Sequence, residues 1–333
     1  MKTLTRCVAA VALTLPLAAC GGGGAESDAT PVTLVVPGPS CLNLYPLRTG
    51  IAEGIFEDVG IDLTVQVVQG SPGVLQALVS GKGDIGLPAP QPVVAAQANG
   101  ADVSLFANVY ARGSFRIIAL DSGAGDLDDL RGKVIGVEAS DGGETAYLHA
   151  TMAGAGMTAG KDYEVKVVGD GGSAVAGFER SDIDAYAASN GAAATIRAAG
   201  VDTVDLSPPP SDSGFGNGLA AKNSWLDENR DTAEAVGRAF RQAAAYASDD
   251  VDAVLDACRE TSPQEVEDRA YAEALLAAAA ESMTPIDDDA WGSWRESGIT
   301  TFLAETERQL GLAPGTVTPD GVFRTDLLEA INR

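Results

Sequence analysis

Few residues in this sequence could take part in covalent or acid–base chemistry. The 333 residues include a single histidine, His149. Hydrolysis by a serine, a histidine and an aspartate, or general-base catalysis by histidine, would have to use it. His149 falls in an expected helix beside Tyr147 and Leu148, where a lone histidine is more often solvated or a capping group. The sequence therefore gives little support to either reaction.

Metal and nucleotide sites are equally unsupported. No group of histidines and cysteines has the spacing of a zinc site. The acidic run Asp287–Asp289 is typical of a solvated helix N-terminus rather than of a calcium site. The glycine-rich stretch 169–174 does not have the spacing of a dinucleotide-binding loop, and no P-loop motif occurs. We expect no cofactor and no metal, and a protein that binds rather than reacts.

Small and polar residues instead gather where expected strands end. In an open α/β sheet these segments lie at the carboxyl ends of the strands, where ligands bind and where small residues let backbone amides reach them. Each segment by itself is also typical of an ordinary turn. The candidate ligand-binding residues are Ser40, Asn43, Tyr45, Gly70, Ser71, Pro90, Gln91, Tyr110, Arg112, Ser140, Asp141, Gly142, Glu144, Thr145, Ser189, Asn190 and Phe215.

Three charged residues bear on the nature of a ligand. Arg112 is the candidate partner of an anionic ligand, with a plain surface role as the alternative. Asp141 and Glu144 begin an expected helix, which they could simply cap. If they face the ligand instead, they favour an amine or a neutral polar group, because a carboxylate repels an anion in a partly dry site. The sequence leaves these alternatives open.

Short strands and helices alternate along the chain and would position these residues. A first set of strands is expected at 32–36, 61–68, 84–89 and 103–110, and a second at 115–122, 133–139, 163–169, 184–189 and 203–207. Helices lie between them, the first at 49–60. Such spacing predicts mostly parallel sheets flanked by helices. A last strand at 218–222 precedes a helical C-terminal region with helices near 230–248, 251–259, 264–282 and 288–310.

Two crossing segments, 115–122 and 215–222, divide this pattern into two α/β lobes joined by hinge strands. We expect one lobe to contain residues 32–118 and 219–333, and the other residues 119–218. Because the chain has a net charge of −25, nucleic acid is an unfavourable partner.

The N-terminal segment predicts export and lipid anchoring. Lys2 and Arg6 precede an apolar run that is too short to span a bilayer, as in a secretory signal. Leu17-Ala18-Ala19-Cys20 resembles a bacterial lipobox. We expect residues 1–19 to be a signal peptide. Cys20 should then carry the lipid, with palmitate among its acyl groups. Residues 20–31, which start at this cysteine, should form a flexible tether. A plain secretory signal is the alternative.

Two other cysteines would remain in the mature chain. Cys41 and Cys258 either form a disulfide, as suits an oxidising compartment, or stay as two buried thiols. The sequence does not decide between these alternatives.

Several motifs occur in order along the chain: Ala52–Phe56, with Gly54 as a departure, then Gly60–Asp62, Gly70-Ser71, Ala77–Gly81 and Asp84–Gly86. The stretches DLDDLRGKVIGVEAS (126–140) and ERSDIDAYAAS (179–189) continue the pattern. Together they resemble the solute-binding proteins of ABC importers, in the branch that serves aliphatic sulfonates, taurine, nitrate and thiamine-pyrimidine precursors.

The resemblance covers roughly residues 32–225 and implies a periplasmic-binding-protein type II fold with a ligand in the cleft between the lobes. It further implies a monomer that delivers a small molecule to an ABC permease with its ATPase and touches the membrane only through its lipid. Ala188–Asn190 and the segment 38–45 depart from the patterns of relatives, so the ligand is not named. An enzyme on the same fold, of the pyrimidine-forming or menaquinone-pathway type, is the alternative, and a receptor that feeds a sensor differs only in its partner.

Overall fold

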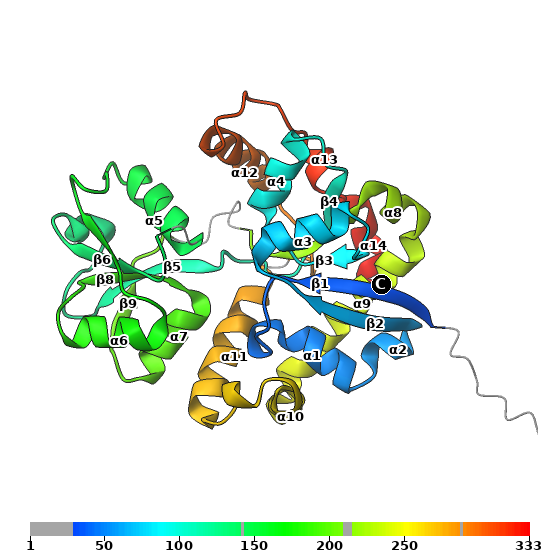
Figure 1. Ribbon diagram of the computed structural model, residues 1–333, viewed down its shortest axis with the longest axis horizontal. Helices are drawn as coiled ribbons and strands as arrows, with labels where there is room; N and C mark the ends of the chain where they lie inside the picture. The colour runs from blue at the N-terminus through cyan, green and yellow to red at the C-terminus, as the bar shows by residue number, and fades with distance from the viewer. Residues whose placement is uncertain (1–28, 141–142, 209–214, 287–288) are drawn as a thin grey trace, which may run out of the picture.

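Two five-stranded sheets, each covered by helices, make up the described part of the protein (Figure 1). The structure is a computed structural model that describes residues 29–140, 143–208, 215–286 and 289–333. The expected signal peptide, the lipid site Cys20 and the site residues Asp141 and Gly142 lie outside these ranges. None of the described helices is long and apolar enough to cross a membrane.

The first sheet has the strand order β2-β1-β3-β10-β4. Strand β1 pairs in parallel with β2 and β3, whereas β10 inserts antiparallel between β3 and β4. The chain therefore leaves this sheet after β4 and returns more than a hundred residues later to complete it. The strands are β1 (Thr30–Val36), β2 (Ile61–Val67), β3 (Ile85–Gly86), β4 (Val103–Asn108) and β10 (Gly218–Lys222).

Helices cover both faces of the first sheet, because alternate residues of its strands point to opposite sides. Leu34 packs into one core with α1 and α9, and its neighbour Val35 packs into another with α3 and α4. The helices are η1 (Leu42–Leu44), α1 (Tyr45–Ala52), α2 (Ile55–Asp58), α3 (Gly70–Val79), α4 (Pro90–Ala98), α8 (Asn223–Glu228), α9 (Arg230–Asp249), α10 (Val251–Thr261), η3 (Pro263–Glu265), α11 (Arg269–Met283), α12 (Glu296–Gln309), α13 (Pro319–Val322), η4 (Thr325–Leu327) and α14 (Leu328–Ile331).

The second sheet has the order β7-β6-β8-β5-β9, in which β6 is parallel to β7 and β8 and β5 runs antiparallel to β8 and β9. Its two faces also carry separate cores, one around Ile135 and Met152 and one around Ile118 and Phe178. The elements are β5 (Phe115–Leu120), η2 (Leu127–Leu130), β6 (Val134–Val137), α5 (Gly143–Gly154), β7 (Glu164–Val167), α6 (Gly171–Glu179), β8 (Ala185–Ser189), α7 (Asn190–Ala198) and β9 (Thr203–Asp205).

Both sheets thus have the same topology. In each, four strands taken in chain order occupy positions 2-1-3-4, and one antiparallel strand fills the place between the third and fourth. That strand is β10 in the first sheet and β5 in the second, and each is the first strand after the chain crosses from the other sheet. The predicted α/β fold with two lobes, mostly parallel sheets and a helical C-terminal region is confirmed. We call each sheet with its helices a lobe.

Three helices differ from their predicted extent. The helix expected over 264–282 begins only at Arg269, after the separate short helix η3. The helix expected over 49–60 begins earlier, at Tyr45, and is divided after Ala52, because Gly54 takes a left-handed conformation with φ of 72°. The helix expected over 288–310 begins only at Glu296, after a non-helical segment whose described part starts at Asp289.

Cys41 and Cys258 form a disulfide within the first lobe, so the choice left open by the sequence is decided. Their Cα atoms lie 5.5 Å apart, and both side chains are fully buried in the core. The bond joins the start of η1 to α10. It therefore ties the N-terminal part of the lobe to its C-terminal helices, which are 217 residues away in the sequence.

Removing this bond should destabilise the first lobe strongly. For a loop of 217 residues, loss of the cross-link frees chain entropy in the unfolded state worth up to about 5 kcal/mol. Chemical denaturation with and without reductant measures the effect. The double variant Cys41→Ala with Cys258→Ala should start from the lower stability and no longer respond to reductant. Equal denaturation midpoints for the oxidised and reduced native chain would contradict the expectation.

Candidate functional site

The predicted site residues follow the carboxyl ends of strands in both lobes. Helices α3 and α4 begin after β2 and β3, and α5, α6 and α7 begin after β6, β7 and β8. The first N–H groups of a helix have no partner within it, so these ends offer donors to a ligand. Two crossing segments connect the lobes, 109–114 and 206–217, and of the second the structure describes 206–208 and 215–217. The described end of the second lies beside the first, because the Tyr110 N–H donates to the Asn217 carbonyl at 3.0 Å.

One contact between the lobes and one beside the first crossing show where the starts of α7 and α5 lie. A Cβ built on Gly191, in the second lobe, would lie 3.7 Å from Oδ1 of Asn43 in the first. The ring of Phe115, on the strand that follows the first crossing, packs so closely on Gly143 that a Cβ there would lie 2.6 Å from it. The starts of α7 and α5 therefore both lie beside the junction of the lobes.

Ser71 joins two of the first-lobe segments. Its Oγ accepts a hydrogen bond from the backbone N–H of Ala89 at 2.9 Å, which links the start of α3 to the start of α4. Gly70 donates its N–H to the carbonyl of Pro37 and has a φ of 63°, which favours glycine at this turn. Pro90 is buried at the first position of α4, whereas the neighbouring Gln91 is exposed.

The segment after β1 is held by the protein itself. Ser40 donates its hydroxyl to Glu265 at 3.3 Å and accepts the N–H of Asn43 at 3.2 Å. Tyr45 is 2% exposed and belongs to the core. Burial raises the pKa of its hydroxyl to about 12, with a hydrogen bond from Ser248 acting in the opposite direction. Of these three predicted residues, only Asn43 has an exposed side chain.

Tyr110 and Arg112 lie on the first crossing segment. The Tyr110 hydroxyl donates to the carbonyl of Asn43, and its pKa is raised, first by burial and then by the nearby Tyr45. Gly216 of the second crossing donates its N–H to the Tyr110 carbonyl at 2.9 Å, so the two crossings run side by side. Arg112 forms no salt bridge with any described residue, and its Nε is buried without a hydrogen-bond partner there.

Glu144 and Thr145 hold the turn that precedes α5. The Glu144 carboxylate accepts the N–H of Ala139 at 3.1 Å, and the Thr145 hydroxyl donates to the carbonyl of the same residue at 2.6 Å. Glu144 thus binds the turn before α5 rather than an N–H of the helix itself, so the two alternatives drawn from the sequence, capping the helix or facing the ligand, stay predictions. Ser140, the last residue described before the gap, is exposed.

A group of carboxylates gives this end of the second lobe a negative potential. Burial raises the pKa of Glu138, and the charges of Glu144 and Asp170 raise it further. The same three carboxylates help to raise the pKa of Tyr186, after the larger effect of burial. The Tyr186 hydroxyl donates to the carbonyl of Gly169 at 2.9 Å, just before α6.

The remaining predicted residues are occupied by contacts within the protein. The Ser189 hydroxyl caps α7 by accepting the N–H of Ala192 at 3.1 Å. Asn190 uses its side-chain amide to bind groups of both lobes, which are described below. Phe215 is 7% exposed and packs on Phe302, with ring centroids 5.4 Å apart.

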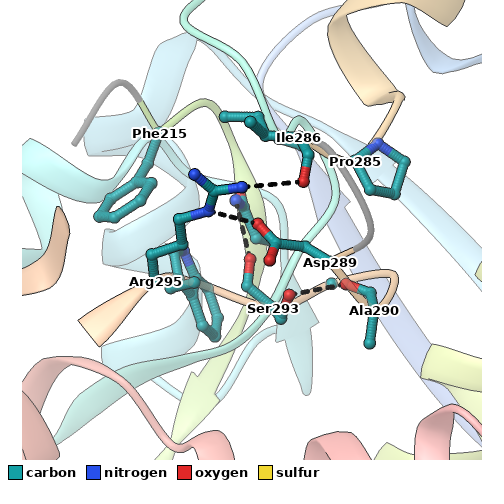
Figure 2. A pocket seen from close by; sticks show the side chains of 11 residues that line it. Phe215, Pro285, Ile286, Asp289, Ala290, Ser293 and Arg295 are labelled. Carbon is teal, nitrogen blue, oxygen red and sulfur yellow. Dashed lines mark hydrogen bonds and ion pairs between the residues drawn. The ribbon is translucent and has the colours of Figure 1, made fainter. Parts of the chain in front are cut away.

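A small, partly open hollow lies beside Phe215, between the end of β4 and the segment that precedes α12 (Figure 2). The guanidinium of Arg295 extends into it and donates to Asp289 at 2.7 Å and to the carbonyl of Ile286 at 3.2 Å. Asn108, only 3% exposed, donates to the carbonyl of Ser293, and its Oδ1 has no partner among the described residues.

Phe215 was the predicted site residue among those that line this hollow, and Asn108, Arg295, Glu138 and Asp170 were not predicted. Asn108 belongs to an expected strand, and Arg295 to a segment expected to be helical, so no end of an element marked them. Glu138 lay inside the strand expected over 133–139, whereas Asp170 follows an expected strand, and that position was the signal available for it. No group of three or more His, Cys, Asp or Glu among the described residues could hold a metal ion.

Comparison with known proteins gives one family match and several structural ones. A family model described as NMT1/THI5 like matches residues 42–253. No curated protein matches the sequence.

Three solved structures with a similar fold are described as sulfonate- or nitrate-binding proteins. The alkanesulfonate-binding protein SsuA from Xanthomonas axonopodis pv. citri, bound to MOPS, is 17% identical with a TM-score of 0.61 over 89% of this chain and 98% of its own. A putative sulfonate-binding SsuA from Methylobacillus flagellatus KT is 14% identical, and its TM-score of 0.67 covers 92% of this chain and 94% of its own. The nitrate-binding protein NrtA from Synechocystis PCC 6803 is 15% identical, and its TM-score of 0.64 covers 91% of this chain and 88% of its own.

The carboxylate group predicts a dependence of stability on pH. Because the folded-state pKa of Glu138 lies above its unfolded value, its unfavourable effect is absent below the unfolded pKa and develops as the pH rises through the folded one. Glu138→Gln should therefore stabilise the protein at pH 7 and not at about pH 3.5, where both states bind the proton. The gain should be about 0.5 kcal/mol at most, since solvent screens exposed carboxylates.

Chemical denaturation at the two pH values measures this difference. Glu179→Gln removes an exposed carboxylate of α6 and serves as the control, for which no such gain is expected. An unchanged or lower stability of Glu138→Gln at pH 7 would show that the three carboxylates do not repel one another.

Proposed function

Because the chain belongs to the NMT1/THI5-like family, we propose that it is an extracytoplasmic solute-binding lipoprotein, which captures a small polar organic ligand or an oxyanion between its lobes and delivers it to an ABC importer permease. The fold of sulfonate- and nitrate-binding proteins supports this proposal. The lipobox-like segment that ends at Cys20 supports the lipid anchor, and the acidic, glycine-rich residues after it suit a tether.

Arg112 is the observation that carries the proposal. It lies on the crossing between the lobes, where its backbone N–H donates to the carbonyl of Ser282 at 3.0 Å. An unpartnered buried donor costs about 1–3 kcal/mol, and more when it is charged, so such groups usually have a partner in the functional state. A ligand oxygen between the lobes would be that partner, because guanidinium binds carboxylate, sulfonate and nitrate oxygens well.

The opposite side of the junction favours a second group on the ligand. Glu138, Glu144 and Asp170 place negative charge at the end of the second sheet, which repels a simple anion and attracts an amine or another donor. A molecule with an acidic group at one end and an amine or several N–H donors at the other satisfies both sides. Aminosulfonates and amino-acid-like compounds have this character.

An enzyme of the same fold is the competing function. His149, the one histidine of the sequence, is exposed on α5 of the second lobe, and its Nδ1 is hydrogen-bonded to the Tyr163 hydroxyl at 3.0 Å. Catalysis would therefore have to rely on carboxylates or on a bound cofactor. The two functions differ in one observable: a receptor returns its ligand unchanged.

A thermal-shift screen at one pH tests the proposal. The panel contains an alkanesulfonate, taurine, nitrate, a hydroxymethylpyrimidine and an amino acid. We expect one class to raise the melting temperature in proportion to the logarithm of its concentration, with a stabilisation of about 2.7 kcal/mol at a hundred times Kd. Arg112→Ala should weaken binding of that compound at least about tenfold, equal to about 1.4 kcal/mol.

Arg197→Ala is the matched control, because Arg197 is exposed on α7 and its loss changes the net charge equally. Equal affinities of the Arg112 and Arg197 variants would remove Arg112 from the site. A compound that disappears during the assay and yields a product would identify an enzyme instead.

A further inference from the structure

Asn190 joins the two lobes by side-chain hydrogen bonds, as Thr195 of α7 also does more weakly through the Tyr271 hydroxyl of α11 at 3.5 Å. It is the first residue of α7, directly after β8, and is 8% exposed. Its backbone N–H donates to the carbonyl of Ser114 at 3.0 Å. Its Nδ2 donates to the carbonyl of Gly113 at 3.2 Å and to the hydroxyl of Ser282 at 2.5 Å. One side chain thus binds the crossing segment and α11 of the first lobe together.

Arg116 completes the arrangement from the other side of the amide. Its Nε donates to Oδ1 of Asn190 at 2.6 Å, so both ends of the amide are satisfied. Its guanidinium also pairs with Asp205 of the second lobe at 3.0 Å and, at 3.9 Å, with Glu281 of α11. Because these groups come from both lobes, Arg116 reinforces the same junction.

Ser282 is the first-lobe half of the contact. It is 3% exposed, and its hydroxyl donates to the carbonyl of Ala278, which leaves its oxygen free to accept the Asn190 amide. Its own carbonyl accepts the N–H of Arg112 at 3.0 Å. The end of α11 is therefore bound both to the second lobe and to the residue proposed to bind the ligand.

Close packing of α7 on α11 surrounds these bonds (Figure 1). A Cβ on Gly191 would lie 2.9 Å from Cδ1 of Leu275, so a side chain there would displace Leu275. Ala194 is 6% exposed and packs with the core of the first lobe, although its helix belongs to the second. The junction between α7 and α11 is therefore a packed interface, and the polar contacts of Asn190 lie at its end.

We propose that Asn190, held by Arg116 and Ser282, is the positioning residue that sets the angle between the two lobes. Rotation of one lobe about the crossing segments must lengthen the bond from Asn190 to Ser282, because α7 and α11 belong to different lobes, whereas the bond to Gly113 ties Asn190 to the crossing itself. Only a neutral amide accepts from Arg116 and donates to two oxygens at once. Asn190, a candidate ligand-binding residue in the sequence, thus affects binding indirectly, because it holds the two lobes at one angle. This role goes beyond the proposed function.

The angle can be measured without any ligand, so this test is independent of the proposed function. Spin labels are attached at Ala146→Cys on α5 and Ala304→Cys on α12, two exposed helix positions in different lobes. Cys7→Ser and Cys20→Ser in the full chain leave these as the reactive thiols, with the disulfide intact. Pulsed electron paramagnetic resonance then gives the distribution of distances between the lobes.

We expect one narrow distribution for the native sequence and a distribution at least twice as wide, or displaced, for Asn190→Ala. Ser282→Ala should have the same kind of effect, and the double variant should add little to Asn190→Ala, because both substitutions remove the same bond between Asn190 and Ser282. Backbone amide exchange of residues 109–116 should quicken in the same variants, because freer rotation of the lobes strains the crossing segment, whose Arg112 N–H is held by the Ser282 carbonyl.

Asn332→Ala is the matched control. Asn332 also donates from its side-chain amide to two carbonyls, those of Trp291 and Leu328, but both belong to the first lobe. Its distance distribution should stay native. Ser282→Ala removes only a hydroxyl, so its distance distribution and amide exchange test the proposal even if Asn190→Ala fails to fold. A native distribution and native exchange in Ser282→Ala would overturn the proposal, as would equal broadening in Asn332→Ala.

Discussion

Each sheet of this protein is completed by a strand that arrives from the other lobe, and this constraint determines where everything else lies. β10 fills the gap between β3 and β4, and β5 fills the equivalent gap between β8 and β9. Both strands lie inside a sheet, where their backbone groups are paired on either side. The crossings therefore cannot move away from the sheets, and the ends of the parallel strands meet around them.

The junction brings two opposite electrostatic environments together. On the first crossing, Arg112 presents a buried Nε with no partner among the described residues, whereas the second sheet ends in Glu138 and Asp170. Between them, Asn190 and Ser282 bind the lobes to each other. The residue proposed to bind the ligand and the residue proposed to position the lobes are thus joined through Ser282, whose carbonyl accepts the Arg112 N–H and whose hydroxyl accepts the Asn190 amide. A ligand that moves one of these groups acts on the other.

The positions of the strands along the chain follow from local sequence patterns, but their order within the sheets does not. Each of the ten strands lies within or near its predicted range, since β-branched runs bounded by glycine and proline are local signals. The places of β5 and β10 were not predictable, because strand order depends on contacts between distant residues. The same limit applies to the site. Sequence identified Ser189, Asn190 and Glu144 as polar groups near strand ends, but not that each already has a partner within the protein. Asn108 carried no signal, since it continues a fully buried strand.

The claim that a small molecule is held unchanged between the lobes is tested most directly by equilibrium dialysis. The full chain is dialysed against a mixture of small metabolites, and the compound that it retains is released by denaturation and identified by mass spectrometry. The account predicts one compound in a ratio of about one per chain, chemically unchanged, and much less of it on Arg112→Ala. Retention of no compound by the native chain, or recovery of a converted product, would contradict it.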